Sequence, residues 1–142
     1  MNTIQFYDYF FDEINKFLKK KKKINIMITR GRSIKKFYSY VNSRIDKSII
    51  KRINFFLSDE RIFEKDSNTN FFFVKETLFK GYKKKEFKLN NFFKKDKNLI
   101  ENLDYYESFL PKIDFIILSY GIDGHIASLF PALKPQIKKK GL

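Results

Sequence analysis

The chain has 142 residues, with 30 Lys and Arg against 16 Asp and Glu, and a formal net charge of +14. This length fits one domain with a buried core. The absence of cysteine excludes disulfides and thiolate chemistry, and one histidine without cysteine argues against a structural zinc site. No apolar run approaches the roughly 20 residues that a membrane-spanning helix needs.

The charge excess has two interpretations. A basic surface attracts phosphorylated metabolites, nucleic acid and acidic membranes. Lys, Asn, Ile and Phe are all abundant, as expected of an A/T-rich genome, and lysine is spread through every segment. We therefore interpret the charge as mutational bias, and we expect no specific nucleic acid and no membrane as partner. No signal peptide is visible at the N-terminus, so we expect a cytoplasmic protein.

The first segments alternate between helix and strand. Apolar residues spaced by three and four predict an amphipathic helix from Thr3 to about Lys20. A short alternating strand over 24–29 follows, then the loop Thr29–Ser33 and a helix from Ile34. A strand, a tight loop and a helix N-terminus can hold phosphate, because free backbone N–H groups and the helix dipole face the anion. Without other evidence, this loop favours a plain turn over a binding site.

A second buried strand is predicted over 53–58, with Asp59, Glu60 and Arg61 at its end. Strands that alternate with helices indicate βαβ units and a parallel sheet. Ser67 or Asn68 is suited to cap the following helix, which we expect to end at Gly81.

The next two segments are a basic stretch and a helix. Residues 82–97 mix lysine with phenylalanine, which favours an edge strand and loop and leaves binding of single-stranded nucleic acid as the alternative. Residues 98–110 carry Leu99, Leu103, Tyr106 and Leu110 on one stripe, which predicts a helix that ends at Pro111.

The most informative segment begins with an apolar run over 113–118, which predicts a strand buried on both faces. The chain then breaks at Gly121–His125, and residues 126–130 have the composition of a helix start before Pro131. The two glycines, Gly121 and Gly124, allow a sharp turn and a close approach to a ligand. Open α/β sheets place their ligand sites just past such a strand, so we expect Asp123 and His125 to point into the mouth of the sheet.

The run from Gly121 to Pro131 resembles the 6-phosphogluconolactonase signature, Gly-x-Asp-Gly-His-x-Ala-Ser-Leu-Phe-Pro, without a gap. The related glucosamine-6-phosphate deaminases share Asp-Gly-His but continue with Phe-Asn-Glu-Pro, so the comparison favours the lactonases. The run Asp59-Glu60-Arg61, followed by Ser67-Asn68, resembles a second family pattern in the expected order.

The loop after the first strand is only partly similar to the family's Ser-Gly-Gly-Ser-Thr-Pro. Gly31 matches, and Thr29 and Ser33 are near equivalents. Arg30 stands in place of a glycine and Ile34 in place of the proline. An arginine adds a contact to phosphate or blocks the close approach of the backbone, and both outcomes stay open.

The resemblance implies hydrolysis of 6-phospho-D-glucono-1,5-lactone to 6-phosphogluconate in the oxidative pentose phosphate pathway, with no metal and no organic cofactor. His125 falls on the family's proposed base and suits proton transfer near neutral pH. Asp123 would orient it or hold a sugar hydroxyl, and Arg61 would hold an anion or the developing oxyanion. The expected substrate and phosphate contacts are Gly31, Arg32, Ser33, Asp59, Glu60, Asn68, Gly121 and Gly124.

We therefore expect an α/β fold over residues 1–142, a single partial domain with a Rossmann-like, largely parallel sheet flanked by helices. Family members continue well beyond Pro131, so we expect a fold that is incomplete at the C-terminus. The lysine run at 138–140 suggests a frameshift in an adenine run. A partner chain or oligomer that completes the fold stays open. Three other functions also stay open: a non-catalytic remnant that binds sugar phosphates, a deaminase-like enzyme, and a basic nucleic-acid-binding module.

Overall fold

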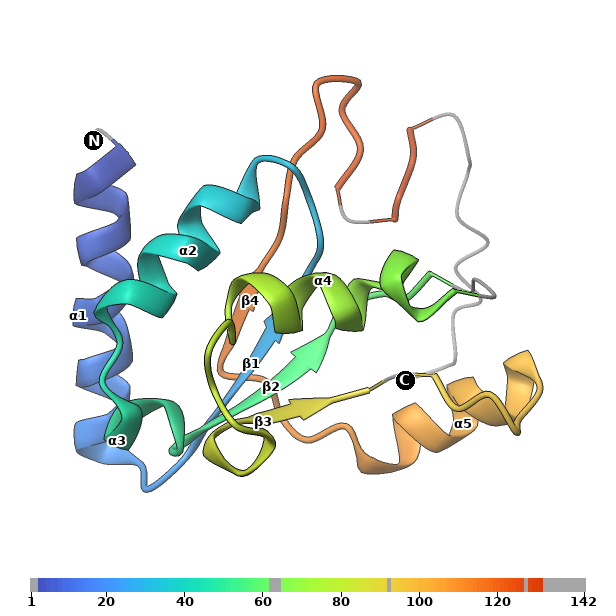
Figure 1. The fold of residues 1–142 in the computed structure, drawn as a ribbon, viewed down its shortest axis with the longest axis horizontal. Coiled ribbons are helices and arrows are strands. Elements are labelled where there is room, and N and C mark those ends of the chain that lie inside the picture. Colours follow the sequence, from blue (N-terminus) through green and yellow to red (C-terminus); the bar gives the residue numbers. More distant parts are fainter. Residues whose placement is uncertain (1–2, 62–64, 92, 127, 132–142) are drawn as a thin grey trace, which may run out of the picture.

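The computed structural model describes residues 3–61, 65–91, 93–126 and 128–131. Its centre is a four-stranded sheet of order β3-β2-β1-β4 in which every neighbouring pair is parallel (Figure 1). The strands are β1 (Ile24–Ile28), β2 (Ile53–Leu57), β3 (Lys88–Asn90) and β4 (Phe115–Ile117). The predicted parallel α/β architecture is confirmed.

Helices flank the sheet on both faces (Figure 1). They are α1 (Thr3–Lys20), α2 (Ile34–Arg44), α3 (Lys47–Ile50), α4 (Asn70–Thr77) and α5 (Leu99–Phe109), with 3₁₀ turns η1 (Asp66–Asn68) and η2 (Lys84–Glu86). On one face α1 meets β4, where the rings of Phe17 and Phe115 lie 4.4 Å apart. On the other face α5 packs on β2, where the hydroxyl of Tyr106 donates to the Leu57 carbonyl at 2.6 Å. Within the described residues, no helix is long and apolar enough to cross a bilayer.

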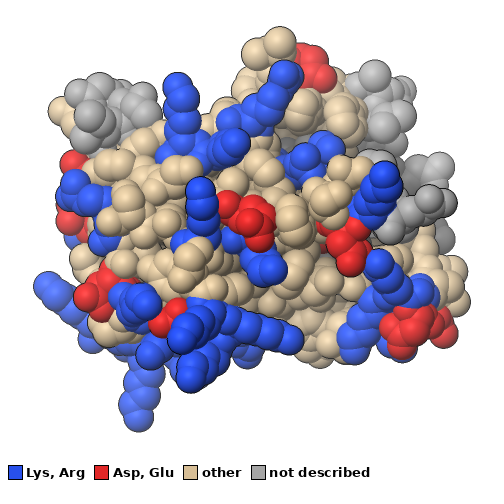
Figure 2. Space-filling view, in the orientation of Figure 1, with Lys and Arg blue, Asp and Glu red and all other residues tan. Residues whose placement is uncertain are grey.

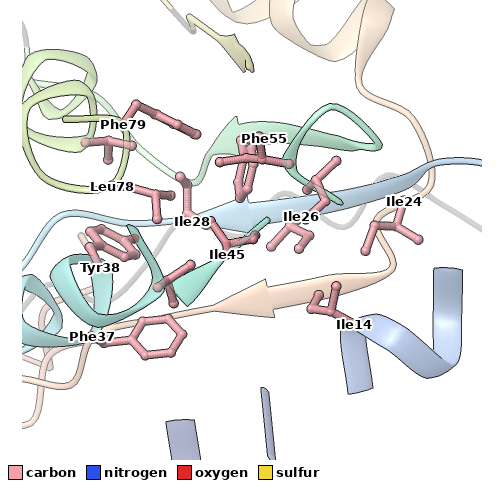
Figure 3. Close-up of a cluster of buried hydrophobic side chains, with 14 of the residues drawn as sticks. Ile14, Ile24, Ile26, Ile28, Phe37, Tyr38, Ile45, Phe55, Leu78 and Phe79 are labelled. Carbon is pink, nitrogen blue, oxygen red and sulfur yellow. The ribbon is translucent and has the colours of Figure 1, made fainter. Parts of the chain in front are cut away.

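The core lies between the sheet and the helices α1, α2 and α4. Alternate residues of β1 point into it, and Ile24, Ile26 and Ile28 have no exposed surface. Side chains from α1, α2 and the end of α4 close around them (Figure 3). Each fully buried side chain of this size contributes about 1.5–3 kcal/mol, so this cluster fixes the positions from which the strands emerge.

Most predicted elements are confirmed. The structure has the helix from Thr3 to Lys20, both early strands, the helix from Ile34 and the edge strand inside the basic stretch. The helix α5 begins where expected because Asn98 and Glu101 form a capping box: each side chain accepts a hydrogen bond from the other residue's backbone N–H.

Some boundaries were predicted wrongly. Neither Ser67 nor Asn68 caps α4, because Thr69 does, with its hydroxyl 3.1 Å from the N–H of Phe72. The helix ends at Thr77, before the turn at Gly81. The short helix α3 was not predicted, and Asp46 caps it by accepting from the Ser48 N–H.

The prediction of a strand buried on both faces at 113–118 was wrong. In the structure β4 is an edge strand, and Ile116 and Leu118 are 59% and 46% exposed. The physical reason is one-sided cover: α1 packs on the Phe115 side, and among the described residues no strand pairs with the outer edge. The stripe of α5 is likewise only partly buried, since Leu99 and Leu103 are 53% and 47% exposed.

Candidate active site

A cavity of about 960 Å³ opens at the carboxyl ends of β1, β2 and β4. This is where parallel sheets place ligands, because the loops that follow the strands converge at that edge. Eight of the eleven residues predicted for the site line the cavity: Gly31, Arg32, Ser33, Asp59, Arg61, Gly121, Asp123 and His125.

The imidazole of His125 and the carboxylate of Asp123 form a close pair, with Nδ1 and Oδ1 2.5 Å apart. The hydrogen bond from His125 lowers the pKa of Asp123, which keeps this carboxylate ionised at neutral pH. An ionised carboxylate only accepts, so Nδ1 of His125 donates to it. In the neutral imidazole the other nitrogen, Nε2, is then the proton acceptor.

The backbone around this pair explains the two glycines. A Cβ at Gly121 would lie 2.2 Å from Cε1 and 2.3 Å from Nδ1 of His125, so only glycine leaves room for the ring. Gly124 has φ +86°, a conformation that side chains rarely adopt.

The predicted helix start after His125 was wrong for the described residues. Ile126 forms antiparallel bridges with Tyr120 and with Leu129, so the segment doubles back as a tight hairpin. The N–H of Gly121 donates to the His125 carbonyl at 2.8 Å, which closes this loop. Ala127 and residues 132–142, with the lysine run at 138–140, lie outside the described residues.

The carboxylate of Asp59 joins three segments at the floor of the cavity. It accepts hydrogen bonds from the hydroxyls of Thr29 at 3.2 Å, of Ser58 at 2.9 Å and of Ser128. Thr29 and Ser58 follow β1 and β2, and Ser128 belongs to the loop that carries His125. Asp59 therefore ties the histidine loop to the ends of two strands.

Glu60 and Arg61 point in different directions. Both oxygens of the Glu60 carboxylate are used at the N-terminus of α4, by the N–H groups of Asn70 at 2.5 Å and Phe71 at 3.0 Å. Glu60 thus binds the first two N–H groups of α4, where the helix dipole favours a negative charge. Arg61 lines the cavity. The pKa of Arg30 is lowered mainly by its own burial and, to a smaller extent, by the positive charge of Arg61.

Arg30 lies on the wall of the cavity without blocking it. Its guanidinium donates to the Asn68 carbonyl at 2.7 Å and lies over the ring of Phe73, 5.1 Å from its centre. The side chain in the glycine's place thus links the loop after β1 to the start of α4. Gly31 packs closely on another residue of the cavity wall, because a Cβ there would lie 2.8 Å from the side chain of Ser119.

The residues just before α2, Gly31, Arg32 and Ser33, line the cavity. Ser33 occupies the N-cap position but makes no capping hydrogen bond through its side chain. Arg32 and Ser33 thus stand at the cavity beside the N-terminus of α2, and a helix N-terminus favours an anion.

The cavity is also lined by residues that the sequence did not predict, namely Asn70, Ser119, Tyr120 and Ser128. Asn70 is completely buried, and its side-chain carbonyl has no hydrogen-bond partner among the described residues. The structure places it, rather than the predicted Asn68, on the cavity wall. A hydroxyl residue followed by an asparagine occurs at Thr69–Asn70 as well as at Ser67–Asn68, so the sequence already offered Asn70 as an alternative to Asn68. Gly124 does not line the cavity either.

The described residues contain no group of three His, Asp or Glu side chains placed to hold a metal ion. The ionisable groups on the cavity wall include the imidazole of His125, the carboxylates of Asp59 and Asp123, and the guanidinium groups of Arg30, Arg32 and Arg61.

Residues 3–140 match the family model described as glucosamine-6-phosphate isomerases/6-phosphogluconolactonase. The chain belongs to this family. It is 36% identical, over 150 aligned positions, to the 6-phosphogluconolactonase of Borreliella burgdorferi, and the alignment covers 89% of this chain and 57% of that protein. The chain thus spans little more than half the length of this curated relative.

Solved structures of family members have the same fold. The 6-phosphogluconolactonase of Thermotoga maritima has a TM-score of 0.71 and 27% identity, covering 87% of this chain and 58% of that one. The enzyme of Trypanosoma brucei has a TM-score of 0.72 over 97% of this chain and 62% of its own, and its 18% identity supports the fold alone.

Proposed function

We propose that this protein hydrolyses 6-phospho-D-glucono-1,5-lactone to 6-phosphogluconate, and that it does so in the cytoplasm. The observation that carries the proposal is the His125–Asp123 pair on the wall of a cavity that arginines also line. A base beside an anion site is what hydrolysis of a phosphorylated lactone requires. The sequence relationship to 6-phosphogluconolactonases supports the choice of substrate.

The proposed reaction begins at Nε2 of His125. This nitrogen takes a proton from water as the water oxygen bonds to the lactone carbonyl carbon. Asp123 keeps the ring in the required tautomer and stabilises the imidazolium that forms, as carboxylates do beside catalytic histidines. When the tetrahedral intermediate collapses, the ring C–O bond breaks and the imidazolium returns the proton to the leaving oxygen.

Two basic groups have separate roles in this proposal. Arg61 stabilises the negative charge that develops on the carbonyl oxygen, an effect strongest where water is excluded. Arg32, Ser33 and the first N–H groups of α2 hold the phosphate. Gly31 lets the backbone of that loop come close to the phosphate. Arg30 fixes the loop by donating a hydrogen bond to the Asn68 carbonyl.

We assign Asn70 to substrate recognition. A buried carbonyl without a partner costs about 1–3 kcal/mol, and a sugar hydroxyl in the cavity would satisfy it. Asp59 and Glu60 act as positioning residues. Asp59 holds the histidine loop through Ser128, and Glu60 accepts from the first N–H of the helix that begins with Asn70.

The test is hydrolysis of freshly generated lactone above its spontaneous rate, by this chain and by its His125→Ala variant. We expect a rate that falls at least about 100-fold in the variant, with unchanged circular dichroism. Equal rates in the two proteins would reject His125 as the base. A folded wild-type chain with no rate would reject catalysis. Retained binding of 6-phosphogluconate would then support the non-catalytic alternative.

A further inference from the structure

Lysines that are spread along the sequence gather at one edge of the folded chain. All four strands are parallel, so all of them begin at the same edge of the sheet. Basic residues stand before or at each of these beginnings, and the short helix α3 adds one more. We call this surface the lysine edge; its exposed members are Lys19, Lys20, Lys21, Lys22, Lys23, Lys47, Lys51, Lys83, Lys84, Lys85, Lys88 and Lys112.

Few negative charges offset this surface. In the same segments of the chain stand three carboxylates, those of Asp46, Glu86 and Asp114, and each is already engaged. Asp46 caps α3, Glu86 pairs with Lys47 at 2.8 Å, and Asp114 binds Lys21. These segments carry twelve lysines and three carboxylates, so much of the net charge of +14 lies on one side. Figure 2 shows this side as a dense group of Lys and Arg at the lower left, below the end of α1.

The side chain of Arg52 holds the backbone of the lysine run after α1 in place. The guanidinium of Arg52, just before β2, donates to the carbonyls of Leu18 at 2.6 Å, Lys21 at 2.9 Å and Lys22 at 3.0 Å. This brace joins the run to the start of the neighbouring strand. The lysines before β1 and β2 therefore form one continuous surface, although about 30 residues of chain separate them.

The chemistry of the lysine edge favours a phosphate backbone as ligand. Lysine carries a point charge on a flexible stem, so it binds phosphate without requiring a particular geometry around it. None of the exposed large apolar side chains of the described residues belongs to this edge, so it offers neither a platform for base stacking nor an anchor for a bilayer. With strands about 4.8 Å apart, four strand beginnings span about 15 Å. This length covers about four phosphates of one strand of a duplex.

We propose that the lysine edge binds the backbone of duplex nucleic acid without regard to sequence. The amino-terminal edge of the sheet lies opposite the cavity, which opens at the carboxyl ends of the strands. A bound duplex therefore leaves the candidate active site accessible. The distribution of charge in space, rather than its total, carries this proposal, so the test compares variants of equal net charge.

The experiment measures fluorescence anisotropy of a labelled duplex of random sequence between about 50 and about 200 mM salt. One variant removes four charges from the lysine edge: Lys20→Gln, Lys22→Gln, Lys51→Gln and Lys84→Gln. The matched control removes four exposed lysines elsewhere: Lys36→Gln, Lys65→Gln, Lys75→Gln and Lys95→Gln. Circular dichroism verifies that both variants fold.

For the wild-type chain we expect log affinity to fall against log salt with a slope of about −3.6, the value for four neutralised phosphates. The lysine-edge variant should lose at least about tenfold in affinity at physiological salt, and the control less than about threefold. Equal losses would mean that only net charge matters and would overturn the proposal. Binding to phosphatidylserine vesicles without binding to the duplex would also overturn it, in favour of a membrane surface.

Discussion

Replacing Gly121 by alanine tests the geometry of the candidate site most directly. The added Cβ would stand 2.2 Å from Cε1 of His125 and 2.6 Å from the Asp123 carboxylate. Carbon atoms in contact normally lie at least about 3.5 Å apart, so the imidazole has to move by about 1.3 Å. The loop is at the surface, where the substitution leaves the rest of the fold in place.

The expected effect follows from that displacement. A shift of about 1 Å in a reacting group costs about 100-fold in rate, so we expect kcat for lactone hydrolysis to fall by about this factor. The free energy of unfolding should change by no more than about 0.5 kcal/mol, because no core contact is lost.

Two measurements check this expectation. The rate of lactone hydrolysis reports catalysis, and the NMR signals of the imidazole report its position without ambiguity, since His125 is the only histidine. The matched control is Gly81→Ala. Gly81 has φ +83° and no atom within 4 Å of an added Cβ, so this variant should lose about 1 kcal/mol of stability and keep its rate.

The opposite outcome would refute the reasoning. A Gly121→Ala protein with the wild-type rate and unchanged imidazole signals would show that the ring does not stand beside this glycine. Changed imidazole signals with an unchanged rate would support the position of the ring but contradict the proposed catalytic role of His125.

Three further predictions concern the core, the sheet edge and pH. Tyr38→Phe should cost about 1–3 kcal/mol in chemical denaturation, because it leaves the buried Thr29 carbonyl without the hydroxyl that now donates to it at 2.6 Å. Ile116→Lys should leave the free energy of unfolding within about 0.5 kcal/mol, since this side chain is 59% exposed; a loss of several kcal/mol would mean that the strand is covered. His125 lowers the pKa of Asp123, so their interaction stabilises the folded chain fully above the ordinary carboxyl pKa of about 3.9 and is lost as pH falls through the lowered value. Carboxyl NMR titration should show the pKa of Asp123 rising towards 3.9 in His125→Gln, and an unchanged pKa would contradict the pairing.

The sequence determined the succession of elements because local pattern governs it. Apolar spacing fixed α1, and β-branched runs fixed β1 and β2. The motif around His125 carried the family and placed the imidazole and its carboxylate at the mouth of the sheet. Such features depend on residues close together in the chain, so their signals survive without a structure.

Only the tertiary structure decided which faces are covered and which side chains meet. The apolar run at 113–118 has the composition of a central strand, yet β4 lies at the edge of the sheet that the described residues form, because cover depends on elements distant in sequence. Asn70 reaches the cavity and Asn68 does not, since one residue begins α4 and the other precedes its cap. The lysines look evenly spread in the sequence, and parallel pairing of the strands brings their beginnings, and hence the lysines, to one edge of the sheet.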